Sequence, residues 1–549
     1  MDPLIVAIGV VVLVVIVTAF SPRVGVAGRL VLVVIGVIVS FLSWVPRVEV
    51  DPEIILSGVL PPLLYSSAVS MPSMDFRRDF RPISALSVIL VVLSAVAVGV
   101  VLSWLIPGLG LPAGIALGAI VSPTDAVATS IARHLGVPSR VVTVLEGESL
   151  LNDATALVLL RAAIAATAGT VSVRGIALQF AFSVIVAVVI GVLVGAVNLR
   201  IRRALRNPAA STAISFVVPF VASIPAEALG ASVIVAAVAA GLVTGSGLAR
   251  YLRPQDRSAD EQNRRTIELL LEGGIFLLMG LQVHGLLTDL RDGGGGGALR
   301  TAVLLGAAVA GVVILVRALH VTALLLGLGS QAKRRQAKPP PTSPGKSATG
   351  SFLVSGVFSS GERAVIIWAG MRGAVTVAAA QTLPDNTPHR ALLILIAFVV
   401  AAGTLLQGGT LPTLVKALRL TGTDPAVVEA ERGRLLATIN QAGASVLENP
   451  GLQRPNGDTY DAALARMVRG RILQAADVQH QDALQETKEQ GFEPRLAVID
   501  VQRRTLLKAR QAGTYTSSTL RDVLAALDAE QIAIELNGGL PAQLNDPGD

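Results

Sequence analysis

The sequence predicts an all-α polytopic membrane protein with about 13 transmembrane helices, followed by a soluble helical tail. The 549-residue chain is 52% hydrophobic and only 15% charged, whereas a soluble globular chain usually carries about 25% charged residues. Apolar runs of about 20 residues follow one another up to Leu420, and each is long enough to cross a hydrocarbon core about 30 Å thick. From Thr421 onward these runs stop and charged residues become frequent.

Each apolar run defines one expected span. The first, Leu4 to Phe20, lacks a basic n-region and a small-residue cleavage site, so we expect a retained span rather than a signal peptide. The expected spans lie near residues 4–20, 30–45, 53–72, 83–106, 112–132, 141–169, 176–199, 211–225, 229–249, 267–287, 301–328, 364–383 and 391–415.

The basic residues of the short connections predict the orientation. With the N-terminus outside, 22 Lys and Arg lie in the cytoplasmic connections and 5 in the external ones, and basic residues favour the cytoplasmic side. We therefore expect the N-terminus outside and the C-terminus in the cytoplasm, which requires an odd number of spans. The expected location is the plasma membrane, here a bacterial inner membrane.

The chain divides into a transmembrane domain (residues 1–418) and a cytoplasmic tail (421–549). Gly293 to Gly297 predicts a short external link, and residues 329–363, rich in Lys, Pro, Ser and Gly, predict a flexible cytoplasmic loop within the domain. Helix-like apolar spacing recurs in the tail at 425–449, 458–490, 493–512 and 517–536. A regulatory or dimer-stabilising role is the default expectation for this tail.

Ionisable groups inside a bilayer are costly, so their positions indicate function. The first cluster is Ser122-Pro123-Thr124-Asp125 in the fifth span, with Asp125 roughly 20 Å deep at about 1.5 Å per residue. Pro123 removes a backbone donor and disfavours helix at Ser122. Free carbonyls beside a carboxylate suit a dehydrated monovalent cation. The alternative is a proline kink with a salt-bridged aspartate.

The second cluster lies in the sixth span, between Glu146 and Asp153. Residues four apart share a helix face, so Ser149 and Asp153 form one stripe, while Glu148 and Asn152 form another about 100° round. The first stripe offers a hydroxyl and a carboxylate to an ion, and the second offers hydrogen bonds that hold the helix in register. Because Asp153 lies as deep in its span as the acid of the fifth span, the two carboxylates are expected to converge.

The third cluster, Trp368 to Val375 in the twelfth span, contains a buried arginine, Arg372, between two glycines. Such an arginine needs an anionic or carbonyl partner, and Glu148 is the expected one. Other intramembrane polar groups are interpreted as structural: Arg161, Glu268, Glu272, Gln282, His284, Arg317, His320 and Gln407.

Enzymatic chemistry is not indicated. The chain has no cysteine, which excludes disulfides and thiolate metal sites. No HExxH, Walker or GxGxxG pattern occurs in a suitable context, and His134 falls at the cytoplasmic end of its span, away from Ser149 and Asp153. We expect no enzyme activity and no cofactor. The basic pI reflects loops near anionic lipid, so no nucleic-acid partner is expected.

The segments SPTDAVA, EGESLLNDA and GMRGAV, in that order, resemble the electroneutral monovalent cation/proton antiporter family, which includes bacterial NhaP-like proteins and sodium/proton exchangers. The resemblance covers about residues 1–418. It implies inverted repeats, a six-helix core with two crossed discontinuous helices (spans 5 and 12), and a dimerisation domain that forms a homodimer. The implied ion-binding residues are Asp125, Asp153, Ser149 and Thr124, with Glu148, Asn152 and Arg372 as a supporting network.

The resemblance also implies the mode of transport. The electrogenic branch has two adjacent aspartates where this chain has Asn152 and Asp153, so one Na⁺, K⁺ or Li⁺ is expected to exchange for one H⁺. Two nearby carboxylates repel each other, which favours a proton or a cation on one of them, and competition between the two couples their flows. The sequence departs from many NhaP-like members at Ser66 and Ser67, where those members have a glutamate, and this leaves the cation preference open.

The sequence leaves three other functions open. A potassium/proton antiporter of the same fold is the main alternative, since both cations prefer oxygen ligands. A membrane sensor with the tail as output is more remote. A cation channel would use similar buried acids without coupling to protons.

Overall fold

The computed structural model describes residues 3–24, 28–42, 53–125, 127–168, 173–205, 207–294, 298–336, 358–420, 425–448, 462–474, 492–513 and 515–538. Across these ranges the secondary structure is helical, with no strand, so the predicted all-α class is confirmed. The helices up to residue 417 are α1 (Pro3–Val24), α2 (Gly28–Ser40), α3 (Leu60–Ser70, after a π-helical turn at Ile54–Val59), α4 (Ser73–Arg78), α5 (Phe80–Ser84), α6 (Leu90–Leu105, after a π-helical turn at Ala85–Ile89), α7 (Leu111–Val121), α8 (Val127–His134), α9 (Ser139–Ala168), α10 (Val173–Ala204), α11 (Pro208–Ala228), α12 (Val233–Tyr251), α13 (Pro254–Leu281), α14 (Val283–Gly294), α15 (Ala298–Gln336), α16 (Ser360–Trp368), α17 (Ala374–Gln381) and α18 (Arg390–Ala417).

Eight helical segments in the described ranges are long and apolar enough to cross a membrane. They correspond to the predicted spans 4, 6 to 11 and 13. Shorter apolar helices at 8–21, 28–40, 54–70 and 111–121 coincide with spans 1, 2, 3 and the first half of span 5. The total of 13 spans stays a prediction.

Two predicted spans are split into half-helices. Span 5 consists of α7 and α8, which are separated by the non-helical residues around Pro123, and span 12 consists of α16 and α17, separated by residues 369–373. A proline removes a helical hydrogen bond, and glycines on either side of an arginine permit an extended backbone. These breaks lie where the sequence predicted irregular backbone.

Several predicted boundaries shift. The segment that corresponds to span 10 begins at Pro254; helix α13 ends at Leu281, and after a turn at Gln282 the segment continues into α14. Gly293 and Gly294 belong to α14, and residues 295–297 of the predicted link lie outside the described residues. The helix α15 continues to Gln336 and α16 starts at Ser360, while residues 337–357 of the predicted loop also lie outside the described residues.

Close packing of α2 on α13 fixes part of the site. A Cβ on Gly36 would lie 2.5 Å from the carbonyl oxygen of Leu277 and 2.9 Å from the Cα of Gly280. Only glycine at these two facing positions lets the backbones approach so closely, as small residues do between membrane helices. The two helices are therefore held in fixed register.

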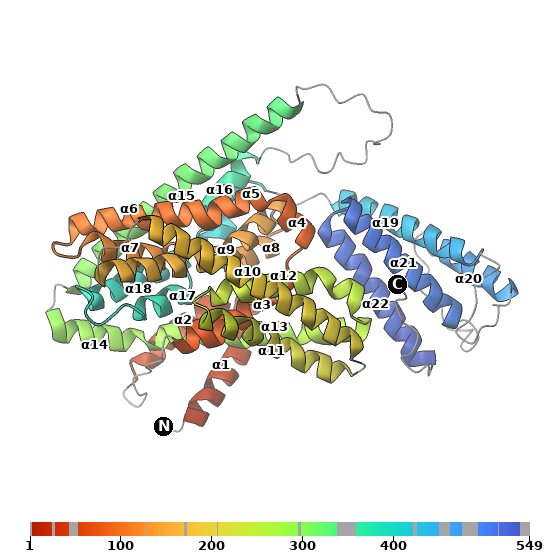
Figure 1. Cartoon of the computed structure of the whole chain (residues 1–549), viewed down its shortest axis with the longest axis horizontal. Helices are drawn as coiled ribbons and strands as arrows, with labels where there is room; N and C mark the ends of the chain where they lie inside the picture. The colour runs from red at the N-terminus through yellow and green to blue at the C-terminus, as the bar shows by residue number, and fades with distance from the viewer. Residues whose placement is uncertain are drawn as a thin grey trace.

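The tail forms a separate group of helices, α19 (Pro425–Val446), α20 (Ala462–Gln474), α21 (Phe492–Ala512) and α22 (Ser517–Gly538). Figure 1 shows these helices, in blue, gathered at one end of the molecule beside α4. Their own small core contains Leu435, Leu506 and Leu527, and Met74 of α4 packs against it. The predicted helical segments of the tail agree with α19, α21 and α22, whereas residues 475–490 lie outside the described residues.

Candidate functional site

The two helix breaks meet in the middle of the bundle. The backbone N–H of Asp125, in the first break, donates a hydrogen bond of 2.8 Å to the carbonyl of Met371 in the second. Gly373 lies so close to the Asp125 carboxylate that a Cβ at this position would overlap it. Asp125 therefore sits beside the N-terminal end of α17, where the helix dipole favours negative charge.

A pocket of about 70 Å³ opens at this crossing. Because one water molecule needs roughly 10–15 Å³ of cavity space, the pocket has room for a few waters or a partly hydrated ion. We call it the inner pocket. It is lined by Leu60, Leu63, Leu64, Ser67, Pro123, Thr124, Asp125, Ser149, Asp153, Glu272, Ile275, Phe276, Gly373, Val375 and Thr376.

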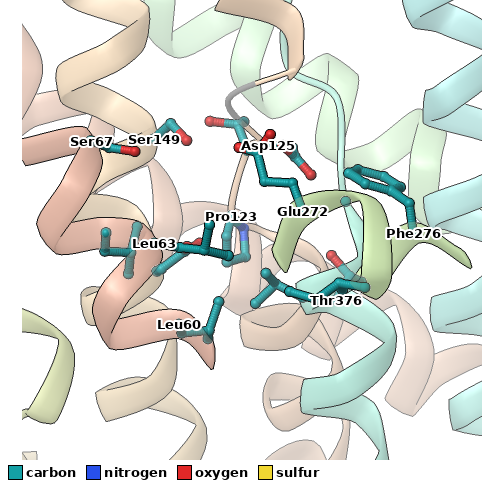
Figure 2. A pocket seen from close by; sticks show the side chains of 15 residues that line it. Leu60, Leu63, Ser67, Pro123, Asp125, Ser149, Glu272, Phe276 and Thr376 are labelled. Carbon is teal, nitrogen blue, oxygen red and sulfur yellow. The ribbon is translucent and has the colours of Figure 1, made fainter. Parts of the chain in front are cut away.

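The four ion-binding residues predicted from the sequence all line the inner pocket. Asp125 and Thr124 come from the break in span 5, and Ser149 and Asp153 come from one face of α9. Figure 2 shows Asp125 and Glu272 together in one part of the pocket, with Ser149 and Ser67 to one side. Asp153 and Ser149 are each only 8% exposed, so water around these groups is limited.

The second stripe of α9 faces away from the pocket and holds the break in place. Asn152 Nδ2 donates to the Thr124 hydroxyl at 2.8 Å and to its carbonyl at 3.3 Å. The Thr124 hydroxyl in turn donates to Glu148 Oε1 at 3.2 Å. A carbonyl oxygen has two lone pairs, so Thr124 retains one for a further contact.

The predicted ion pair between Glu148 and Arg372 is wrong. Glu148, 1% exposed, instead pairs with Arg317 of α15, which donates to both carboxylate oxygens, with Nη2 at 2.8 Å from Oε2. The Nε and Nη2 atoms of Arg317 also donate to the carbonyl of Ile366 at 3.0 and 2.8 Å. The sequence places Arg317 inside an apolar span, but it predicts only a structural role and does not indicate that Arg317 is the partner of Glu148.

Arg372 satisfies the other expectation for a buried arginine, a carbonyl partner. Its Nε donates to the carbonyl of Val121 at 2.9 Å, and its Nη1 donates to the carbonyl of Gly370. The backbone N–H of Arg372 donates to the hydroxyl of Thr404 in α18 at 2.9 Å. Arg372 is 2% exposed, and these hydrogen bonds stabilise the non-helical segment between α16 and α17.

Each of the two buried arginines thus donates hydrogen bonds to a carbonyl at the C-terminal end of a half-helix. Val121 is the last residue of α7, and Ile366 lies in the last turn of α16. Helix C-termini leave carbonyls without partners and carry partial negative charge. Arg372 covers the end of α7 and Arg317 covers the end of α16, so neither guanidinium faces the inner pocket.

The inner pocket contains a third carboxylate that the sequence analysis interpreted as structural. Glu272 of α13 lines the pocket and forms an ion pair with Arg29 of α2. Ser67 contributes its side chain to the same pocket, whereas the Ser66 hydroxyl donates to Glu268 Oε1 at 2.6 Å. No three His, Cys, Asp or Glu side chains in the described ranges are grouped to hold one metal ion.

A larger cavity of about 750 Å³ adjoins the inner pocket, and we call it the tail-side cavity. Its walls come from α2, α3, α4, α8, α9, α12 and α13 of the membrane domain, and from the tail helices α21 and α22. Leu64, Ser67, Ser149 and Glu272 line both spaces. The two spaces therefore meet at these four residues.

Tail helices are anchored over this cavity by polar contacts. Arg257 of α13 donates to both carboxylate oxygens of Asp528 in α22, and Arg503 of α21 pairs with the same carboxylate at 3.2 Å. Arg510 Nη2 donates to the Ser73 hydroxyl at 2.8 Å. Burial lowers the pKa of Arg503, with the nearby charge of Arg257 acting in the same direction.

Three of the other intramembrane polar groups, Gln282, Gln407 and His284, form contacts between helices. Gln381 donates to Gln282 at 2.8 Å, Gln407 donates to the carbonyl of Trp368 at 2.8 Å, and His284 packs edge-on against Phe41. The sequence interpretation of these groups as structural agrees with such contacts.

The chain is similar to known sodium/proton exchangers in sequence. The family model described as sodium/hydrogen exchanger, transmembrane, matches residues 9–417. An uncharacterised Na⁺/H⁺ exchanger of Mycobacterium tuberculosis is 31% identical, and the alignment covers 100% of this chain and 97% of that protein. A sodium, potassium, lithium and rubidium/H⁺ antiporter of Bacillus pumilus is 27% identical over 69% of this chain and 56% of its own length.

Among solved structures, the sodium proton antiporter MjNhaP1 from Methanocaldococcus jannaschii has a similar fold. The TM-score is 0.58 at 17% sequence identity, over 76% of this chain and 99% of that chain.

Proposed function

The chain belongs to the sodium/hydrogen exchanger family, and on that premise we propose that it exchanges one Na⁺ for one H⁺ by competition of the two ions for Asp125 and Asp153. The observation that carries the proposal is the inner pocket, where these two carboxylates, the Ser149 hydroxyl and Thr124 line one small space. Hard oxygen ligands of this kind suit an alkali cation.

Competition follows from the limited hydration of the pocket. An empty pocket with two ionised carboxylates is costly because burial disfavours charge and like charges repel. Either a proton or a cation on Asp153 relieves that cost, so the two ligands exclude each other. Net transport in one direction then requires return of the other ion, and no ATP is needed.

A 1:1 stoichiometry is supported by Asn152. The Asn152 side chain is neutral and 1% exposed, and its amide nitrogen donates a hydrogen bond to the Thr124 hydroxyl. It therefore adds no second titrating group beside Asp153. The exchange is therefore proposed to be electroneutral. The supporting network consists of Glu148, Asn152 and Arg372, to which Arg317 is added.

Potassium/proton exchange is the second candidate. The printed name of the Bacillus pumilus relative includes sodium, potassium, lithium and rubidium, and the serines at positions 66 and 67 leave the third span without a carboxylate at the pocket. We further propose a homodimer in the plasma membrane, with the N-terminus outside and the tail in the cytoplasm, as the positive-inside bias favours.

The test is exchange in liposomes that hold an interior-acid pH gradient and a pH-sensitive dye. We expect sodium, lithium or potassium salts to dissipate the gradient, choline to fail, and the rate to be unchanged when the membrane potential is varied. Asp153→Asn should abolish exchange in folded protein, whereas the exposed tail variant Asp522→Asn should not. If none of the cations dissipates the pH gradient in liposomes that contain folded wild-type protein, the proposal is overturned and the sensor function is favoured.

A further inference from the structure

Glu272 occupies the junction between the two spaces described above. Of the carboxylates in the described ranges, it alone lines both the inner pocket and the tail-side cavity. Asp125 and Asp153 line only the inner pocket, and Glu268, one turn earlier in α13, lines only the cavity. A cation that moves between cavity and pocket therefore passes the Glu272 side chain, where it begins to exchange water for protein oxygens.

Arg29 holds a competing positive charge at the same place. It forms an ion pair with Glu272, and the two side chains are 26% and 24% exposed. Arginine stays protonated in proteins, so its charge is permanent. The close packing of α2 on α13 at Gly36 and Gly280 fixes the helices that carry the pair. Because the pair is partly solvated, water screens it and a mobile cation is able to compete with Arg29 for the carboxylate.

Neither of the neighbouring serines, Ser66 and Ser67, brings a negative charge to the junction, so Glu272 is the residue that attracts the cation there. Ser66 turns its hydroxyl to Glu268, and Ser67 brings a neutral hydroxyl to both spaces. The third span thus supplies no charge at the junction, and α13 supplies it instead.

We propose that Glu272 is a further cation-binding residue, which receives the cation at the junction, and that Arg29 sets the apparent affinity by competing for the Glu272 carboxylate. This inference rests on the proposed function and names a further residue of the same site. If this inference holds, removing Glu272 and removing Arg29 change the KM for sodium in opposite directions. If the ion pair were purely structural, both removals would change KM in the same direction.

The test compares KM for sodium and maximal rate in liposomes for three variants. Glu272→Gln should raise KM roughly tenfold, the change that the loss of about 1.4 kcal/mol of cation binding produces, with a smaller effect on maximal rate. Arg29→Gln should lower KM, because the carboxylate loses its competitor. The double variant should behave like Glu272→Gln, since Arg29 acts only through that carboxylate. Glu227→Gln, an exposed glutamate of α11 that lines neither space, is the matched control.

A second readout does not depend on transport. Sodium should raise the melting temperature of purified wild-type and Arg29→Gln protein, and the sodium concentration needed should be higher for Glu272→Gln. If Glu272→Gln does not fold, Glu272→Asp keeps the charge on a shorter side chain and should raise KM by less. If KM shifts in the same direction for Glu272→Gln and Arg29→Gln, or shifts in neither, this inference is overturned. The proposed function still holds in that case, provided that wild-type protein exchanges the ions. Absence of exchange in wild-type protein would instead overturn the proposed function, and the sodium-dependent melting shifts would still decide the role of Glu272.

Discussion

Replacing Arg317 by methionine should destabilise the protein strongly, because the change strands a buried carboxylate. Glu148 is 1% exposed and takes both of its strong hydrogen bonds from this guanidinium. Removing one partner of a buried ion pair costs about 3–5 kcal/mol. With an unfolding entropy of roughly 2.1 cal/mol/K per residue over roughly 400 residues, this loss lowers Tm by about 4–6 °C.

The assay is thermal unfolding of purified variants in one detergent, followed by size-exclusion fluorescence. Arg317→Met and Glu148→Gln should each lower Tm, and the double variant should lose less than the sum, because no unpaired charge remains in it. Arg372→Met is the matched control: its guanidinium bonds only carbonyls, so no acid is stranded and the loss should be smaller. If Arg317→Met melts within about 1 °C of wild type while Arg372→Met loses more, the pairing of Glu148 with Arg317 is refuted. That result would favour the pairing of Glu148 with Arg372 expected from the sequence.

Two further substitutions test the crossing and the tail. Gly373→Ala should raise KM for the cation, because the added Cβ would displace the Asp125 carboxylate, whereas Gly274→Ala, where a methyl group meets open space, should exchange like wild type in the same liposome assay. Asp528→Asn should make the tail cleave faster in limited proteolysis, because both Arg257 and Arg503 lose their anionic partner, and an unchanged cleavage rate would contradict the proposed anchoring.

Local chemistry made much of the site predictable from sequence. Pro123 and the glycines around Arg372 mark the two breaks because their effects on the backbone are short-range. The four-residue spacing of Ser149 and Asp153 places them on one helix face whatever surrounds it. Depth along apolar runs then brings Asp125 to the same level.

The errors arose where the answer depends on how separate helices are rotated. Arg317 and Arg372 both lie deep in apolar spans, and periodicity gives the depth of each but not the direction that it faces. Choosing the partner of Glu148 requires the rotation of α15 about its own axis. The same holds for Glu272, whose place at the pocket depends on the packing of α13 against α2. Docking of the tail over the cavity involves contacts more than 200 residues apart, such as that between Arg257 and Asp528, and no spacing rule indicates it.

The position of the tail-side cavity has a practical consequence for experiments. Ala525 and Ala529 of α22 form part of its wall, and the natural chain contains no cysteine. A cysteine introduced at Ala525 is therefore the sole thiol in the molecule and requires no background mutagenesis. Its alkylation rate by a water-soluble reagent then measures directly how accessible the cavity is while sodium, potassium or protons are varied.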